Sequence, residues 1–296
     1  MEFRHLRYFV AVAEELHFAR AAERLHIEQS PLSRAIKELE SDLGVLLLER
    51  TTRTTRLTWA GQVFLDDVRH LFLVLEQAKA NVHAAASGYR GTLRVALSDG
   101  IIPHRLTTLL ARCREEEPDV DIRLSEVPLT QQLKGLRNRL YDVGFARSST
   151  VGEGILAKPL WEDPLMIALP SRHPLLARKH LQLDEVLKYP LVLYHPEICE
   201  GFYSQITRIL RTASVQPVVA EHVASHDLML ALVAAGYGIG FVCKAQITAC
   251  QRPGIAARPL TRQIPRLTTY LLRPAGKASP ELERFMERAN LVQDPD

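Results

Sequence analysis

Residues 29–44 read QSPLSRAIKELESDLG, and this stretch decides the fold of the first part of the chain. Its apolar residues recur at helical spacing and form one stripe: Leu32, Ile36, Leu39 and Leu43. Ser30 is a suitable N-cap, and Pro31 at the first helical position loses only an N–H group that has no partner there. Gly44 is suited to the C-terminal cap. The stretch is therefore predicted to be an amphipathic helix with a polar outer face.

Two shorter amphipathic segments precede this helix. The first carries apolar residues at the i, i+3, i+4, i+7 spacing over residues 6–16, and the second is expected at about 19–25. Two short helices, a tight connector and a third helix form a helix-turn-helix, in which the start of the last helix enters the DNA major groove. The candidate DNA-binding residues of that helix are Gln29, Ser30, Pro31, Ser33, Arg34 and Lys37. A small structural three-helix domain with a solvated polar face is the alternative.

Positive charge is focused in this region rather than spread over it. Residues 1–58 contain nine Lys/Arg and nine Asp/Glu, so their net charge is zero. Residues 45–58, however, read VLLLERTTRTTRLT, with Arg50, Arg53 and Arg56 at every third position and Glu49 as the only acid. Threonine and valine favour extended chain. We therefore predict a basic β-wing that contacts DNA phosphates and makes binding salt-dependent.

The same residues resemble a known family. The pattern FxAVAEExxFxRAAExLxIxQSxLSRAIxxLExxLGxxLxxRxxRxxxLTxAG, within residues 3–61, is similar to the N-terminal domain of LysR-type transcriptional regulators. The resemblance implies a winged helix-turn-helix over residues 1–58 that binds operator DNA. It puts Gln29, Ser30, Pro31, Ser33 and Arg34 at the reading end and Arg50 and Arg53 in the wing. Leu48 replaces a common phenylalanine of the family, and His17 replaces a common capping serine.

Residues 59–88 are predicted to form one long linker helix. No proline occurs between Ala60 and Ser87, and apolar residues recur alternately every four and three positions. This heptad seam consists of Phe64, Val68, Leu71, Leu75, Ala78 and Val82. Sustained heptad spacing is typical of a coiled coil, so we expect the helix to form a homodimer; packing on the chain's own domain is the alternative. The family resemblance also implies paired linker helices, and a homotetramer beyond the dimer.

Strand and helix patterns alternate over residues 89–296. This alternation predicts an α/β domain with parallel sheets, and its length suggests two lobes. The resemblance implies a two-lobed fold like that of periplasmic binding proteins, with an effector between the lobes. In such sheets ligands bind beyond the carboxyl ends of the strands. This rule selects the segment Ser98, Asp99 and Gly100, the turn with Leu129 and Thr130, and Arg147.

The chemistry of the effector is suggested by the resemblance alone. The segment DVGFAR, residues 142–147, is similar to the aromatic-catabolism branch, whose regulators respond to benzoate- or muconate-like compounds, and Phe202 matches a pocket aromatic of that branch. The effector is therefore expected to be an organic or aromatic acid. Gly100 and Leu129 stand where the branch commonly has hydroxyls, and Asp99 would repel a carboxylate unless Arg147 offsets its charge. The alternatives are a salt bridge at the lobe hinge for Arg147 and a core position for Phe202.

Other classes of function have less support. The four cysteines are scattered without a CxxC pair, and no metal or cofactor motif or nucleophile turn occurs, so we expect no metal, no cofactor and no enzyme. Without a signal peptide or an 18-residue apolar run, a cytoplasmic protein with no membrane span is expected. A redox-responsive regulator acting through Cys199 remains an alternative, as do a solute-binding protein and an enzyme with an accessory helix-turn-helix. The favoured interpretation is a ligand-responsive DNA-binding regulator.

Overall fold

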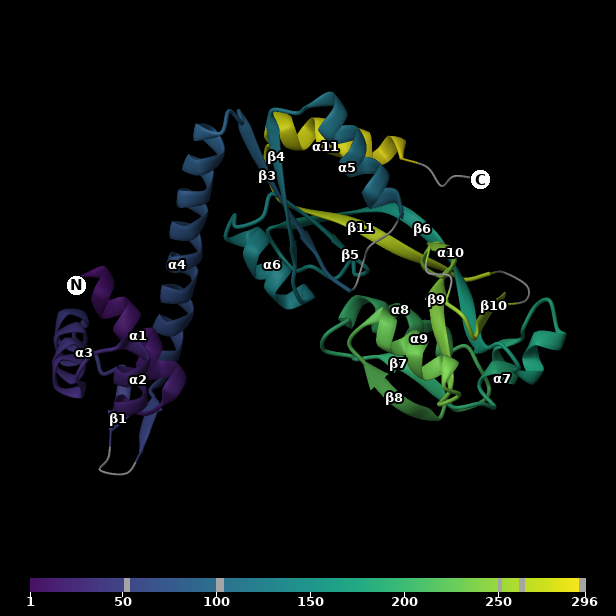
Figure 1. Cartoon of the computed structure of the whole chain (residues 1–296), viewed down its shortest axis with the longest axis horizontal. Helices are drawn as coiled ribbons and strands as arrows, with labels where there is room; N and C mark the ends of the chain where they lie inside the picture. The colour runs from purple at the N-terminus through teal and green to yellow at the C-terminus, as the bar shows by residue number, and fades with distance from the viewer. Residues whose placement is uncertain (51–53, 100–103, 250–251, 261–263, 293–296) are drawn as a thin grey trace. The chain divides into compact units, whose positions relative to one another are not determined.

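The computed structural model describes residues 1–50, 54–99, 104–249, 252–260 and 264–292. The chain divides into two compact units, Met1–His83 and Ala84–Asp296 (Figure 1). No helix in these described ranges combines the length and the apolar character needed to cross a membrane.

Unit 1 contains the predicted three helices and wing. Its elements are α1 (Phe3–Glu15), α2 (Phe18–Leu25), α3 (Gln29–Leu43), β1 (Leu48–Arg50), β2 (Thr55–Leu57) and all but the last three residues of α4 (Trp59–Ala86). The apolar faces of α1, α2 and α3 meet in one core around Phe9, Leu32, Ile36 and Leu39, which are fully buried. The strands β1 and β2 pair antiparallel, with Leu48 opposite Leu57. Leu48 is itself buried, so the departure from phenylalanine is a change of core side chain.

The caps of the short helices differ partly from the predictions. The helix α3 begins at Gln29, and its N-cap is Glu28, which makes no side-chain capping hydrogen bond, so the prediction of Ser30 as the cap is wrong. Pro31 lies inside the first turn, where a missing N–H still costs no hydrogen bond. Gly44 adopts φ 70° at the C-cap, as predicted. His17 caps α2 through Nδ1, which accepts from the Arg20 amide at 3.4 Å, and so takes the place of the serine.

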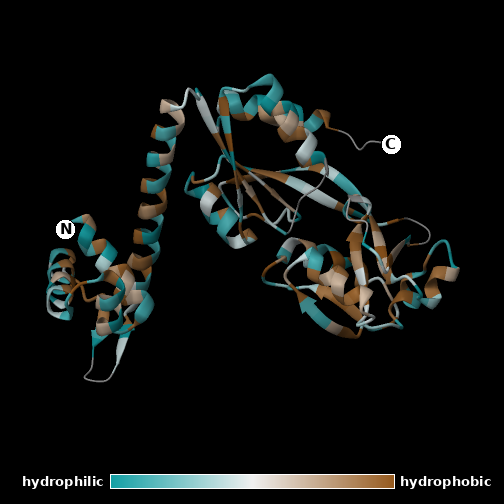
Figure 2. Ribbon diagram, in the orientation of Figure 1, coloured by the Kyte–Doolittle hydropathy of each residue, from teal (hydrophilic) through white to brown (hydrophobic). Residues whose placement is uncertain are grey.

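The long helix α4 meets two different environments along its length. Its first turns complete the core of unit 1, where Leu65 and Val68 are buried and Phe64 packs against Phe9 with ring centroids 5.3 Å apart. Further along, Leu71 is 40% exposed and Val82 69% exposed. Hydrophobic residues recur along the helix (Figure 2). The predicted seam is thus divided, because its first two positions cover the three-helix core, Leu75 is half-buried in a groove beside α1, and Leu71, Ala78 and Val82 are exposed.

Glu40 connects α3 to the wing, a role that no local sequence pattern indicates. Its side chain is 7% exposed, and its Oε1 atom accepts hydrogen bonds from the amides of Leu47 at 2.9 Å and Leu48 at 3.0 Å. Its Oε2 atom accepts from Arg50 Nη2 at 2.7 Å. The buried carboxylate therefore fixes the start of β1 against the helix that precedes it.

We predict that Glu40→Ala lowers the free energy of unfolding of unit 1 by about 3 kcal/mol, because two buried amides and a guanidinium lose their acceptor. Glu23→Ala, at an exposed position on α2, serves as the control and should change it by less than about 0.5 kcal/mol. Pulse proteolysis of the full-length protein over a series of urea concentrations measures the unfolding midpoint of residues 1–83. Equal midpoints for the two variants would contradict this role of Glu40.

Unit 2 is built on a nine-stranded mixed sheet in its described part, in the order β4-β3-β5-β11-β6-β9-β7-β8, with β10 on β6. Lobe 1 contains β3 (Gly91–Leu97), β4 (Val120–Glu126), β5 (Val143–Ala146), α5 (His104–Glu116), α6 (Leu129–Arg137) and α11 (Pro280–Leu291). Lobe 2 contains β7 (Leu191–Tyr194), β8 (Val219–Val223), β9 (Ile239–Cys243), β10 (Ile255–Pro259), α8 (Glu200–Leu210), α9 (His226–Ala234) and α10 (Lys244–Ala249), with the short η1 (Pro174–Ala177) and α7 (Leu183–Val186).

Two long strands join the lobes. The strands β6 (Ile155–Pro170) and β11 (Arg266–Pro274) pair antiparallel and run through both lobes, side by side in Figure 1. Within each lobe β3 pairs parallel with β4 and β5, and β7 pairs parallel with β8 and β9, as predicted. The antiparallel pair was not predicted. Within β6 the pattern LMIAL (165–169) is typical of a strand, whereas Pro159 and Pro164 interrupt the residues before it, so only the last part of β6 is predictable from the sequence.

Candidate nucleic-acid interface and effector cleft

The predicted reading residues gather at the exposed start of α3. Five of them line one open hollow of about 570 Å³ on the surface of unit 1: Gln29, Ser30, Ser33, Arg34 and Lys37. All but Ser33 are exposed, and so is Pro31 in the same turn. They share this face because the stripe of Leu32, Ile36 and Leu39 holds the other face in the core. The result is a row of hydrogen-bond donors and two cations at a helix end whose first amides have no side-chain cap.

The wing arginines do not share one environment. Arg50 is bound to Glu40, and its guanidinium lies over the Phe18 ring at 4.8 Å from the centroid, so it holds the wing in place. Arg56 on β2 is exposed and lies opposite Glu49. Arg53 lies outside the described residues. Arg56 therefore has the exposure that a contact with a DNA phosphate requires, whereas Arg50 is held by Glu40.

Asp99 lies between the lobes and binds backbone amides of both. It follows β3 with φ 60° and is 4% exposed. Its Oδ2 atom accepts from the Arg147 amide at 3.0 Å, and its Oδ1 atom accepts from the amides of Gly201 at 2.8 Å and Phe202 at 3.4 Å. The Ser98 hydroxyl donates to Oδ2 at 3.2 Å. From the sequence alone, the negative charge of Asp99 is expected to repel an acidic effector. In the structure this charge is stabilised by amides at the start of α8 and just after β5.

Arg147 has its side chain in the junction of the lobes. It is 3% exposed, and its Nη2 atom lies 3.5 Å from Asp163 Oδ2 and 3.1 Å from Cys243 Sγ. Asp163 Oδ1 is also 3.7 Å from Arg105 Nη1, so two arginines share one buried carboxylate. The Nε and Nη1 atoms of Arg147 have no hydrogen-bond partner among the described residues. Arg147 and Asp163 therefore form a buried ion pair at the hinge between the lobes, and two nitrogen atoms of Arg147 remain without an acceptor.

Of the remaining predicted effector residues, Phe202 lies at this junction and Leu129 does not. Phe202 is 1% exposed, packs edge-on against Tyr194 at 4.4 Å and lies 5.5 Å below the Arg147 guanidinium carbon. Leu129 is buried in a lobe 1 cluster, whereas Thr130 beside it is exposed. Gly100 lies outside the described residues. Ser98, Asp99, Arg147 and Phe202 are therefore brought together, whereas Leu129 packs inside lobe 1 against Leu136 and Leu272.

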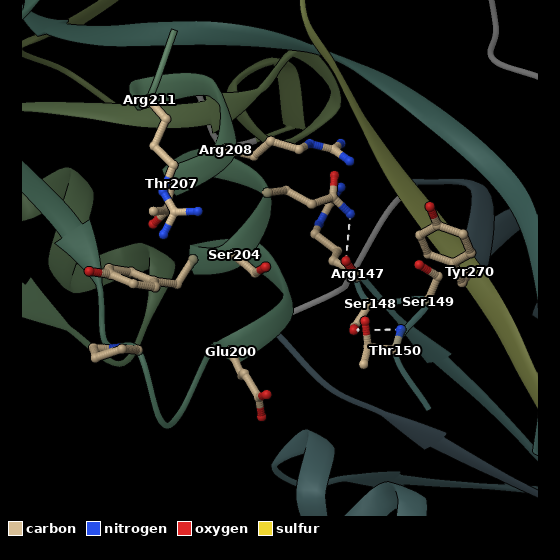
Figure 3. A pocket seen from close by; sticks show the side chains of 13 residues that line it. Arg147, Ser148, Ser149, Thr150, Glu200, Ser204, Thr207, Arg208, Arg211 and Tyr270 are labelled. Carbon is tan, nitrogen blue, oxygen red and sulfur yellow. Dashed lines mark hydrogen bonds between the residues drawn. The ribbon is translucent and has the colours of Figure 1, made fainter. Parts of the chain in front are cut away.

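A polar cleft of about 460 Å³ opens beside this junction. Figure 3 shows side chains from the segment after β5, from α8 and from β11 around it. Its hydroxyl-bearing residues are Ser148, Ser149, Thr150, Tyr203, Ser204, Thr207 and Tyr270, and its charged residues besides Arg147 are Glu200, Arg208 and Arg211. Arg208 and Arg211 are exposed and have no ion-pair partner in the part of the chain that the structure describes. Both lobes thus contribute to a cleft that combines hydroxyls with two available cations.

Sequence reasoning missed the α8 side of this cleft, although a signal was present. One face of α8 is apolar and includes Phe202. The other face carries polar residues at helical spacing: Glu200, Ser204, Thr207, Arg208 and, just past the helix, Arg211. An exposed polar helix face is usually only solvated. The partner segment after β5 is about 55 residues away in sequence, so its position could not be predicted from spacing.

Comparisons with known proteins agree with this architecture. Residues 3–62 match the model of the bacterial regulatory helix-turn-helix protein, lysR family, and residues 86–291 match the LysR substrate binding domain. The chain is 36% identical over 243 residues to the uncharacterized HTH-type transcriptional regulator YnfL of Escherichia coli (strain K12), covering 82% of each protein. It is 34% identical over 242 residues to the HTH-type transcriptional regulator ClcR of Pseudomonas putida, again covering 82% of each.

A solved structure extends the likeness to the whole chain. Full-length CbnR, a LysR family transcriptional regulator, has been solved alone and with its target DNA. It superposes with a TM-score of 0.81 at 30% identity, covering 99% of this chain and 100% of that chain. A helix-turn-helix module joined to a two-lobed ligand-binding domain defines the class of ligand-responsive transcription regulators. The chain belongs to the LysR family of that class, which confirms the family predicted from the sequence.

Cys199 lies close to the cleft but is shielded. It is 2% exposed, its Sγ donates to the Ala224 carbonyl at 3.7 Å, and burial raises the pKa of its thiol to about 11, with a further contribution from the charge of Asp99. Because the reactive form of a thiol is the thiolate, a raised pKa lowers its reactivity at neutral pH. This environment gives no support to the redox alternative.

We predict that Cys199 in the folded protein is alkylated by iodoacetamide at pH 7.5 at least about 100 times more slowly than a free cysteine, because few thiols are ionised and access is blocked. The rate should rise with pH up to about pH 11. Peptide mapping by mass spectrometry measures it, with urea-unfolded protein as the control. Labelling as fast as in the unfolded protein would restore the redox interpretation.

Proposed function

We propose that this LysR-family regulator binds a two-fold symmetric operator through the start of α3 and changes its DNA contacts when a small anionic effector binds between the lobes. The observation that carries the proposal is the cluster of Gln29, Ser30, Ser33, Arg34 and Lys37 on one exposed helix end. CbnR, which has the same full-length fold, has been solved with its target DNA. Because such a regulator acts on operator DNA, we place the protein in the bacterial cytoplasm.

The residues at the start of α3 have the chemistry needed to read bases. Glutamine can bond adenine through two hydrogen bonds, and arginine can bond guanine in the same way. Ser30 and the amides of the first turn suit a phosphate oxygen, because a helix N-terminus carries partial positive charge. In this proposal Gln29 and Arg34 read bases, whereas Lys37 and Arg56 contact phosphates. Arg50 acts indirectly by holding the wing against Glu40.

We predict that Arg34→Ala reduces the affinity for the operator at least about fivefold while changing the affinity for random DNA much less, because a base contact is worth about 1–3 kcal/mol. Arg56→Ala is the matched control. It should weaken both affinities alike and lower the slope of log affinity against log salt by about 1. Anisotropy titrations at several salt concentrations measure both quantities. An unchanged ratio of operator to random affinity in Arg34→Ala would exclude Arg34 from base reading.

The cleft beside Arg147 is our proposed effector site. Arg208 and Arg211 provide positive charge, seven nearby residues carry hydroxyls, and Arg147 retains two buried donors without acceptors. Buried donors that lack acceptors are costly, so an anion that reached them would bind favourably. The cleft therefore suits an organic acid that carries additional polar groups, whether or not the acid contains an aromatic ring. Such an effector acts only through its different affinity for the two arrangements of the lobes.

We predict that calorimetry with a panel of aromatic acids and dicarboxylates identifies a ligand whose affinity falls at least tenfold in Arg208→Ala. An ion pair at about 4 Å in a partly screened site is worth up to roughly 4 kcal/mol before desolvation. Loss of the ion pair with Arg208 is therefore sufficient to lower the affinity tenfold. Arg172→Ala, an exposed arginine elsewhere in lobe 2, is the matched control and should bind like the wild type. A ligand that binds Arg208→Ala with unchanged affinity would place the effector site elsewhere.

Dimerisation through α4 completes the proposal. The outward part of the predicted seam, including Leu71 and Val82, leaves apolar side chains exposed on a 28-residue helix. Pairing these faces in a second copy would bury them and present two reading helices to one operator. Phe64 and Val68 contribute by fixing the helix to the core of unit 1. A homotetramer would form by further pairing of such dimers.

A further inference from the structure

The carboxylate of Asp99 is bound in the way that a protein binds a free anion. Its four donors within 3.4 Å are the amides of Arg147, Gly201 and Phe202 and the hydroxyl of Ser98. They come from both lobes, and the carboxylate is almost completely removed from solvent. No lysine or arginine side chain forms an ion pair with it among the residues that the structure describes. The negative charge is therefore stabilised mainly by backbone dipoles.

The surrounding backbone is shaped to receive this carboxylate. A Cβ atom on Gly201 would come within 2.5 Å of Asp99 Oδ2 and 2.9 Å of the Arg147 carbonyl carbon, so only glycine permits the approach. Gln205 strengthens the same junction, because its Nε2 atom donates to the carbonyls of Arg147 at 2.5 Å and Thr268 at 2.8 Å. Gln205 Oε1 accepts from the Thr268 amide at 2.9 Å. The site is thus assembled from α8, the end of β5 and β11, rather than from a helix end alone.

From this geometry we infer that Asp99 is a built-in ligand: its carboxylate fills a carboxylate-binding site between the lobes and holds them in the arrangement seen here. A free acid cannot use these amides while Asp99 occupies them. An acidic effector is therefore left with the Arg208 and Arg211 side of the cleft. The regulatory meaning of this inference rests on the proposed function, whereas the occupancy of the amide site does not.

Removal of the Asp99 side chain should leave a site that a free carboxylate can fill. Asp99→Gly deletes the carboxylate without backbone strain, because glycine readily adopts the φ of 60° found here. The three amides and the Ser98 hydroxyl would then face a small empty space. Acetate is the aspartate side chain with one added hydrogen, so it matches that space in size and charge. Carboxylates in solution should therefore replace the lost group.

The test is chemical rescue of thermal stability in the full-length protein. Asp99→Gly should melt below the wild type, and 100 mM sodium acetate or formate should restore at least half of the lost Tm. Sodium chloride at equal ionic strength and acetamide, the neutral analogue of acetate, should not restore it. The wild type should show no acetate-specific shift, because its site is filled. Calorimetry should give an acetate affinity for the variant at least tenfold above that of the wild type.

Two further variants keep the test decisive if Asp99→Gly does not fold. Asp99→Ser also removes the carboxylate, and its rescue by acetate carries the same meaning. Asp99→Asn retains the size but places an NH2 group against the amide donors, so acetate should not rescue it. Absence of rescue in both Gly and Ser variants, or equal rescue by chloride, would overturn the inference. No DNA is present in this experiment, so its failure would leave the proposed DNA-binding function untouched.

Discussion

A buried carboxylate that accepts hydrogen bonds from backbone amides of another element is the interaction on which the regulatory half depends. Asp99 joins the end of β3 to the start of α8, and these elements belong to different lobes. Amides at a helix start and at a strand end have no partner within their own element, so they must be satisfied from elsewhere when they are buried. The spacing of the lobes is therefore fixed by hydrogen bonds as well as by β6 and β11.

The DNA-binding half uses the same physical device. Glu40 accepts from two amides at the start of β1, and Arg50 closes the third contact. In both halves a single acidic side chain sets the position of a functional element: the wing in one and α8 in the other. Arg147 adds a second charged junction with Asp163. The effector site that we propose, next to Arg147 and Arg208, adjoins this junction, so a ligand bound there would act on the arrangement of the lobes.

Local patterns predicted most of the fold. The stripe of Leu32, Ile36 and Leu39 gave α3, and strand–helix alternation gave the lobes, because both signals come from neighbouring residues. The antiparallel pairing of β6 with β11 is a contact over about 110 residues, and Pro159 obscured its first part. The site was only partly predictable. Ser98, Asp99, Arg147 and Phe202 were identified from strand ends and family resemblance, but the direction of the Arg147 side chain and the role of Arg208 depend on tertiary packing.

Hydrogen exchange at the start of α8 tests the central claim most directly. In full-length wild-type protein, peptides covering Gly201 and Phe202 should be strongly protected, because their amides are bound to Asp99. In Asp99→Gly without added carboxylate they should exchange at least about 100 times faster, while the first turn of α9, capped by Ser225, should be unchanged. Equal exchange in both proteins would show that Asp99 does not hold the lobes together, and would contradict the account.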